Sequence, residues 1–103
     1  MGIPALRQAL LQTFLSSVSP RLDRLVQAVN TRDAHQVEFE AHGLKGMAAT
    51  IGADACVEVF ARIEQLGHDN QIPPADQLLD RARQEVDRTT RYIESSDSLR
   101  KAA

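Results

Sequence analysis

Apolar residues recur every three or four positions along most of the chain, and no stretch alternates as a strand would. On a helix of 3.6 residues per turn this spacing gathers apolar side chains on one side, so it predicts an all-helical protein. The pattern predicts five helices, at about residues 4–15, 20–29, 34–51, 53–66 and 74–95. Short polar or proline-containing segments between them favour an antiparallel four-helix bundle with a short extra N-terminal helix.

Residues with special backbone preferences mark the expected helix boundaries. Ser19 followed by Pro20 is a pair preferred at helix starts, so a break is expected before the second helix. Asp33 with Gln36 three residues later has the spacing of a capping box and predicts the start of the third helix. Gly52 predicts the end of that helix, because glycine readily adopts the left-handed conformation that terminates helices.

The third expected helix has two distinct faces. Its apolar stripe faces the core and consists of Val37, Ala41, Leu44, Ala48 and Ile51. His42 projects almost opposite this stripe and is expected to be exposed to solvent. Glu38, Phe39 and Ala49 lie within about 60° of His42 around the helix axis, so this face is expected to bind a partner.

Two glycines interrupt the third helix, and each costs a helix interior about 1 kcal/mol relative to alanine. Gly46 lies one turn after His42 and leaves space beside its ring. Gly43 lies toward the flank, where two explanations stay open: close approach of a neighbouring helix, and a functional role. Lys45 lies three residues after His42 and can reach an anion attached to the imidazole. Because a neutral imidazole is a nucleophile near pH 7, His42 is a candidate phosphoryl acceptor.

Composition excludes several other function classes. The 103 residues carry twelve basic and fourteen acidic side chains, a formal net charge of −2 that disfavours nucleic acid as a partner. No apolar run approaches the roughly 20 residues of a membrane span. The single cysteine, Cys56, lies in an apolar helical pattern and predicts a buried thiol in a reducing compartment. One domain over residues 1–103 is expected, with a few frayed residues at each end.

The other two histidines fit simpler roles than phosphoryl transfer. His35 and His68 are read as solvated surface residues, which is the usual role of an isolated surface histidine. His35 and His42 share a face, but two helical turns separate their rings by about 10 Å, too far to share one metal ion. No metal site is therefore expected. Glu38, one turn before His42, is a candidate hydrogen-bond partner for the second ring nitrogen of His42.

The segment AHGLKGMAATIGA resembles the signature of the histidine-containing phosphotransfer (HPt) domain of phosphorelays. The similarity includes His42, Lys45, Gly46 and the Gly52–Ala53 pair, and it extends to RIEQLGHDN and LDRLVQAVNTRD. It implies a four-helix bundle in which His42 accepts a phosphoryl group from a receiver-domain aspartate and passes it to another. The similarity also implies that Lys45 stabilises the phosphoryl group and that Gly46 keeps the site accessible. Gly43 and Cys56 depart from the usual family pattern.

The resemblance also implies what surrounds the site. Receiver domains are the expected partners, and the magnesium ion needed for transfer belongs to the receiver, so this chain needs no cofactor and is no enzyme by itself. We expect a cytoplasmic monomer, either freestanding or the C-terminal domain of a hybrid sensor kinase anchored in the membrane. Two alternatives stay open: a kinase substrate domain phosphorylated from ATP by a separate catalytic domain, and an interaction bundle without phosphoryl chemistry.

Overall fold

In the computed structural model, the backbone of residues 3–102 and the side chains of residues 4–95 are described, and this part of the chain contains helices and turns but no strand. The helices are α1 (Ile3–Asn30), α2 (Ala34–Thr50), α3 (Asp54–His68), α4 (Ile72–Gln77) and α5 (Leu79–Ala102). The predicted all-helical bundle is confirmed. The predicted fraying concerns the chain ends, most of whose side chains lie outside the described residues.

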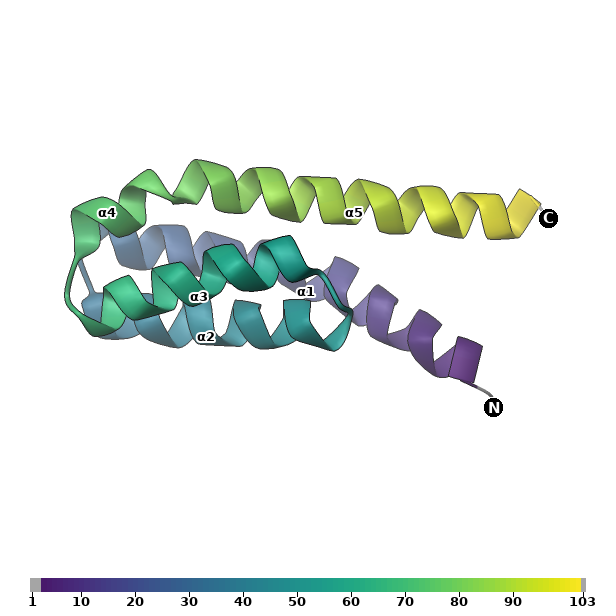
Figure 1. Cartoon of the computed structure of the whole chain (residues 1–103), viewed down its shortest axis with the longest axis horizontal. Coiled ribbons are helices and arrows are strands. Elements are labelled where there is room, and N and C mark those ends of the chain that lie inside the picture. Colours follow the sequence, from purple (N-terminus) through teal and green to yellow (C-terminus); the bar gives the residue numbers. More distant parts are fainter. Residues whose placement is uncertain (1–2, 103) are drawn as a thin grey trace.

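Helices α2 and α3 form an antiparallel hairpin, which α1 and α5 cover (Figure 1). Helix α2 packs most extensively on α3 and next on α1, while α5 packs mainly on α3 and α1. Phe60, Leu25 and Leu44 are the largest apolar side chains that are fully buried between these helices. The core-facing positions predicted for α2 are buried, apart from Ile51, which is only partly buried at the helix end. No helix in the described part of the chain is long and apolar enough to span a membrane.

Three turns of the bundle close in the same way. Each contains one residue with positive φ: Arg32 after α1, Gly52 after α2 and Asn70 after α3. The next residue donates its N–H to a carbonyl five positions back, at 2.8 to 2.9 Å, which is the Schellman closure. Breaks were predicted at all three turns, but the left-handed conformation was predicted only at Gly52, because arginine and asparagine give a weaker signal for this conformation than glycine.

The predicted break between the first two helices is wrong, since α1 continues through Pro20. Its buried stripe passes this point without interruption, with Phe14, Val18 and Leu25 all in the core. Pro20 itself is exposed, so the backbone hydrogen bond that proline cannot make is lost on the solvent side. Burial of the continuous stripe outweighs that local cost. Residues 3–30 therefore form one helix, without the separate short N-terminal helix that was predicted.

The short helix of this bundle is instead α4, because the predicted fifth helix divides at Leu78. Pro73 and Pro74 lie in the first turn of α4, where a missing N–H costs little. Ile72 and Ala75 are buried, and the core stripe continues through Leu79 in α5. Helix α4 thus turns the chain from the α2–α3 hairpin back across the bundle.

Candidate functional site

His42 occupies the solvent face of α2, as predicted, and its side chain is 70% exposed. Asp33 caps the start of this helix by accepting a hydrogen bond from the Gln36 amide at 3.1 Å. Ala41 and Leu44 lie in the core and fix the rotation of α2 about its axis. Because successive residues differ by about 100°, burial of these neighbours directs His42 outward.

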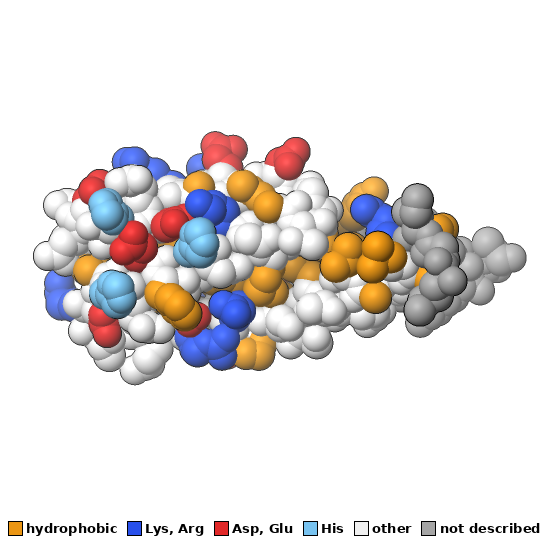
Figure 2. All heavy atoms as spheres, turned by 90° about the horizontal axis from the view of Figure 1, so that it is seen from below, with side chains coloured by type: hydrophobic (Ala, Val, Ile, Leu, Met, Phe, Trp, Pro, Cys, Tyr) orange, Lys and Arg blue, Asp and Glu red, His pale blue; other side chains and the backbone are white. Residues whose placement is uncertain are grey.

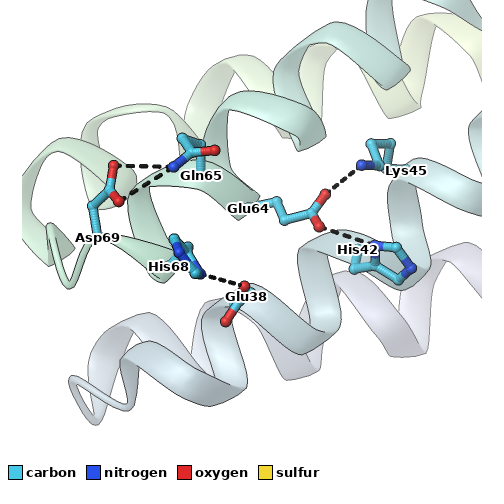
Figure 3. Close-up of polar contacts among 7 residues, drawn as sticks. All are labelled: Glu38, His42, Lys45, Glu64, Gln65, His68 and Asp69. Atoms are coloured by element: carbon cyan, nitrogen blue, oxygen red, sulfur yellow. Dashed lines mark hydrogen bonds and ion pairs between the residues drawn. The ribbon is translucent and has the colours of Figure 1, made fainter.

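Glu64 of α3 connects His42 with Lys45 (Figure 3). The Nδ1 atom of His42 lies 2.9 Å from Glu64 Oε2, and Lys45 Nζ lies 2.6 Å from Glu64 Oε1. Oε1 is buried and has no aligned hydrogen-bond donor among the described residues, so the Lys45 ammonium balances it as an ion pair. A carboxylate accepts hydrogen bonds, and Nδ1 of His42 is therefore the nitrogen that carries the proton.

The environment of Glu64 favours its ionised form. Burial by itself raises the pKa of this carboxyl, but the Lys45 ammonium at 2.6 Å and the hydrogen bond with His42 together outweigh burial and lower the pKa below its usual range. Glu64 is 21% exposed, so these contacts are partly protected from solvent. The carboxylate consequently stays negative at neutral pH and holds both neighbours in place.

Space beside the imidazole comes from Gly46. A side-chain carbon built at this position meets no atom within 4 Å, so the surface there is open. The other ring nitrogen of His42, Nε2, points away from Glu64 and has no partner among the described side chains (Figure 3). A group that approaches along α2 can therefore reach Nε2 without displacing a side chain.

The Hpt domain family model matches residues 9–92, which is most of the chain and includes this site. The chain belongs to the Hpt domain family. Members of the family are phosphocarriers of phosphorelays and interact with receiver domains, and that is the general role of this chain.

Another comparison found a more distant likeness. The Arabidopsis thaliana protein named "Transcription factor TCP13" is 27% identical over 75 residues, which are 73% of this chain and 21% of that protein. This chain thus spans about a fifth of that relative's length, too little to indicate a shared activity. No solved structure gives a significant match.

One sequence-based expectation for this Hpt domain is wrong. Glu38 does not contact the ring of His42; its Oε2 lies 2.9 Å from Nδ1 of His68, on α3 (Figure 3). Glu64 takes the position beside His42 that was predicted for Glu38. The α2–α3 pairing decides which carboxylate faces which ring, and a single helix pattern does not contain that information. The signal available was the position of Glu64 within the family-like segment RIEQLGHDN.

The other predicted partner-binding residues lie on the solvent side of α2. Phe39 is 61% exposed and does not fold back onto a neighbouring helix, and Ala49 is exposed near Gly46. Figure 2 shows histidine and acidic side chains gathered over this part of the surface, beside a hydrophobic group and a basic cluster. The predicted face therefore exists, with His35 also exposed on it.

A buried acid that the sequence did not reveal lies on the α1 side of α2. Glu40 is 2% exposed, and both of its oxygens lie near Nε of Arg24, at 3.1 and 3.5 Å. Arg21 NH1 lies farther away, 3.8 Å from Glu40 Oε1. Burial of a carboxylate in the core requires such compensation, and the contact with Arg24 supplies it.

Proposed function

We propose that this Hpt domain accepts a phosphoryl group on Nε2 of His42 and passes it on. The observation that supports this most directly is the 2.9 Å contact of Glu64 with Nδ1, on an imidazole that is 70% exposed. This contact holds the proton on Nδ1 and leaves the lone pair on Nε2, which faces solvent. A nucleophile oriented in this way needs no further activation near neutral pH.

The donor that suits this site is the phospho-aspartate of a receiver domain. The Nε2 lone pair forms the bond to phosphorus while the bond from phosphorus to the aspartyl oxygen breaks, and the carboxylate leaves with that electron pair. The ring then carries a positive charge and keeps its Nδ1 proton, which Glu64 stabilises from 2.9 Å. Reversal toward a second receiver aspartate returns the neutral imidazole.

Lys45 and Gly46 support the phosphoryl group in this proposal. The Lys45 ammonium rests on Glu64 at 2.6 Å and lies on the same face as His42, so it can turn toward phosphoryl oxygens when they arrive. Gly46 leaves room for the group and for the receiver backbone. Magnesium is supplied by the receiver, and the chain itself holds no cofactor.

Receiver docking is proposed to cover the exposed face of α2 around Phe39, with Glu38 and Ala49 at its edges. Phe39 is a large apolar side chain that is 61% exposed, and aromatic residues of this kind are enriched in interfaces. A cytoplasmic location and a monomeric state are further parts of the proposal.

Phosphotransfer from a radiolabelled phospho-receiver tests the function directly. Wild type is expected to take label, and His42→Gln is expected to take none while its circular dichroism spectrum stays helical. Gln retains a polar side chain at an exposed position, so loss of label would report lost chemistry rather than lost folding.

Two control reactions separate the alternatives. One contains ATP alone, and the other contains ATP with the catalytic domain of a histidine kinase. Label that arrives only from the kinase would identify a kinase substrate domain. Label on His42→Gln would show that the phosphorylation site is another residue. Absence of label from every donor would favour an interaction bundle without phosphoryl chemistry.

A further inference from the structure

Gly43, the residue after His42, makes room for an arginine of α1. A side-chain carbon built at Gly43 would overlap NH1 of Arg21 and would lie 3.3 Å from its Cζ. The Arg21 guanidinium therefore rests directly against α2, where only a glycine leaves space for it. Glycine weakens the helix at this position, so the arrangement calls for an explanation.

Pairing with Glu40 does not supply that explanation. The single Nε–H of Arg24 is already directed at the Glu40 carboxylate and is shared between its two oxygens, at 3.1 and 3.5 Å. Arg21 lies 3.8 Å from the same carboxylate, beyond hydrogen-bond distance. Its side chain is 36% exposed and donates no hydrogen bond to any of the described residues. The guanidinium thus lies in a long ion pair with Glu40 and keeps its hydrogen-bond donors available to a partner.

The two flanks of His42 differ in charge. On the α1 flank, the guanidiniums of Arg21 and Arg24 face the single carboxylate of Glu40, which leaves one positive charge in excess. On the α3 flank, Lys45 only balances Glu64, and Glu38 adds a further carboxylate. Figure 2 shows a group of Lys or Arg side chains beside an exposed hydrophobic group on the face that carries the histidines.

We propose that Arg21 is a docking residue that binds an acidic side chain of the receiver domain, and that Gly43 exists in α2 to position it. The inference rests on the proposed function and specifies the partner: a receiver with a carboxylate on the α1 side of its contact with Phe39. The positive α1 flank and the negative α3 flank orient the receiver across His42, because opposite charges on one surface favour a single docking direction.

The experiment compares Arg21→Ala, Gly43→Ala and the double variant with wild type. Arg83→Ala is the matched control, since it removes the same charge from α5, which covers α3 and α1. For each protein, the second-order rate of transfer from a phospho-receiver is divided by its rate of labelling with phosphoramidate, a small donor that needs no docking. Both rates are measured at low and at high salt.

Arg21→Ala is expected to lower this ratio about fivefold at low salt. The ratio of this variant is also expected to depend much less on salt than that of wild type. Gly43→Ala is expected to cause a similar loss despite its better helix propensity, because its methyl group displaces the flexible end of Arg21. The double variant is expected to show no loss beyond that of Arg21→Ala, and Arg83→Ala is expected to match wild type.

A wild-type ratio for Arg21→Ala would overturn the docking role. A double variant much slower than Arg21→Ala would show that Gly43 acts through something other than Arg21, which overturns the assignment of the glycine. If wild type takes label from phosphoramidate but from no receiver, that result would contradict both this inference and the proposal that receivers are its partners. Normal receiver transfer by Arg21→Ala would leave the proposed function intact.

Discussion

Glu64 is the side chain on which the candidate site depends, because it contacts both His42 and Lys45 from the neighbouring helix. It keeps the proton of His42 on Nδ1 and holds the lysine beside the ring. It is a positioning residue in the proposed reaction, since it acts through the imidazole and does not touch the phosphoryl group.

The lowered pKa of Glu64 predicts a pH-dependent contribution to stability. A carboxyl whose pKa is lower in the folded than in the unfolded protein stabilises the fold above its unfolded value, near 4.5. That contribution is lost as the pH falls through the folded pKa. Wild type is therefore expected to lose more unfolding free energy than Glu64→Gln on acidification from about pH 6 to pH 3. Urea unfolding at several pH values measures this, and parallel curves for the two proteins would contradict it.

At the scale of elements, contact between α2 and α3 sets the geometry of the site. Gly67 of α3 permits this contact: a side-chain carbon there would lie 2.7 Å from the backbone nitrogen of Glu38 and 3.0 Å from Val37 Cγ1. The sequence pattern placed Gly67 in a loop after the fourth helix. In the structure it is buried within α3, and its missing side chain brings the Glu38–His68 pair into reach.

Replacement by alanine is expected to have opposite effects on stability at Gly67 and at Gly46. Gly67→Ala is expected to destabilise the domain by about 1 to 3 kcal/mol, because the added methyl group meets backbone that cannot move aside. Gly46→Ala is expected to stabilise it by up to about 1 kcal/mol, because the methyl group enters open space and improves helix propensity. Chemical unfolding of both variants tests the pair, and equal effects would refute the distinction.

At the scale of the whole molecule, the site lies on a hairpin that α1 and α5 support from the other sides (Figure 1). Cys56 lies in this shared core, is fully buried and contacts Thr89 of α5 at 3.3 Å. Burial is the largest cause of a raised pKa of its thiol, which the Thr89 hydrogen bond partly offsets. The thiol is thus protected from reagents in two ways: packing makes it inaccessible, and its raised pKa keeps it protonated and less nucleophilic.

Reaction of Cys56 with a thiol reagent is expected to require unfolding of the whole bundle. The side chain is inaccessible in the folded state, so the reaction rate at neutral pH should rise with urea in parallel with global unfolding measured by circular dichroism. A fast, urea-independent reaction would indicate local opening of α5 instead. Cys56→Ala, which lacks the thiol, is the control for reagent consumption.

The sequence by itself determined which face of α2 meets solvent. Helical periodicity places His42 opposite the buried stripe, and that holds wherever the neighbouring helices lie. The exposure of His42, the open space at Gly46 and the burial of Cys56 follow from the same rule, and the structure agrees with each. The capping of α2 by Asp33 was equally local and equally predictable.

Only the tertiary structure decided which side chains from different helices meet. The pairs Glu64–His42, Glu38–His68 and Arg21–Gly43 depend on the register of α2 against α3 and α1. The continuity of α1 through Pro20 likewise depends on how much apolar surface the bundle buries. Helical periodicity fixes directions within one helix, whereas register and burial arise from packing among all of them, which no single segment specifies.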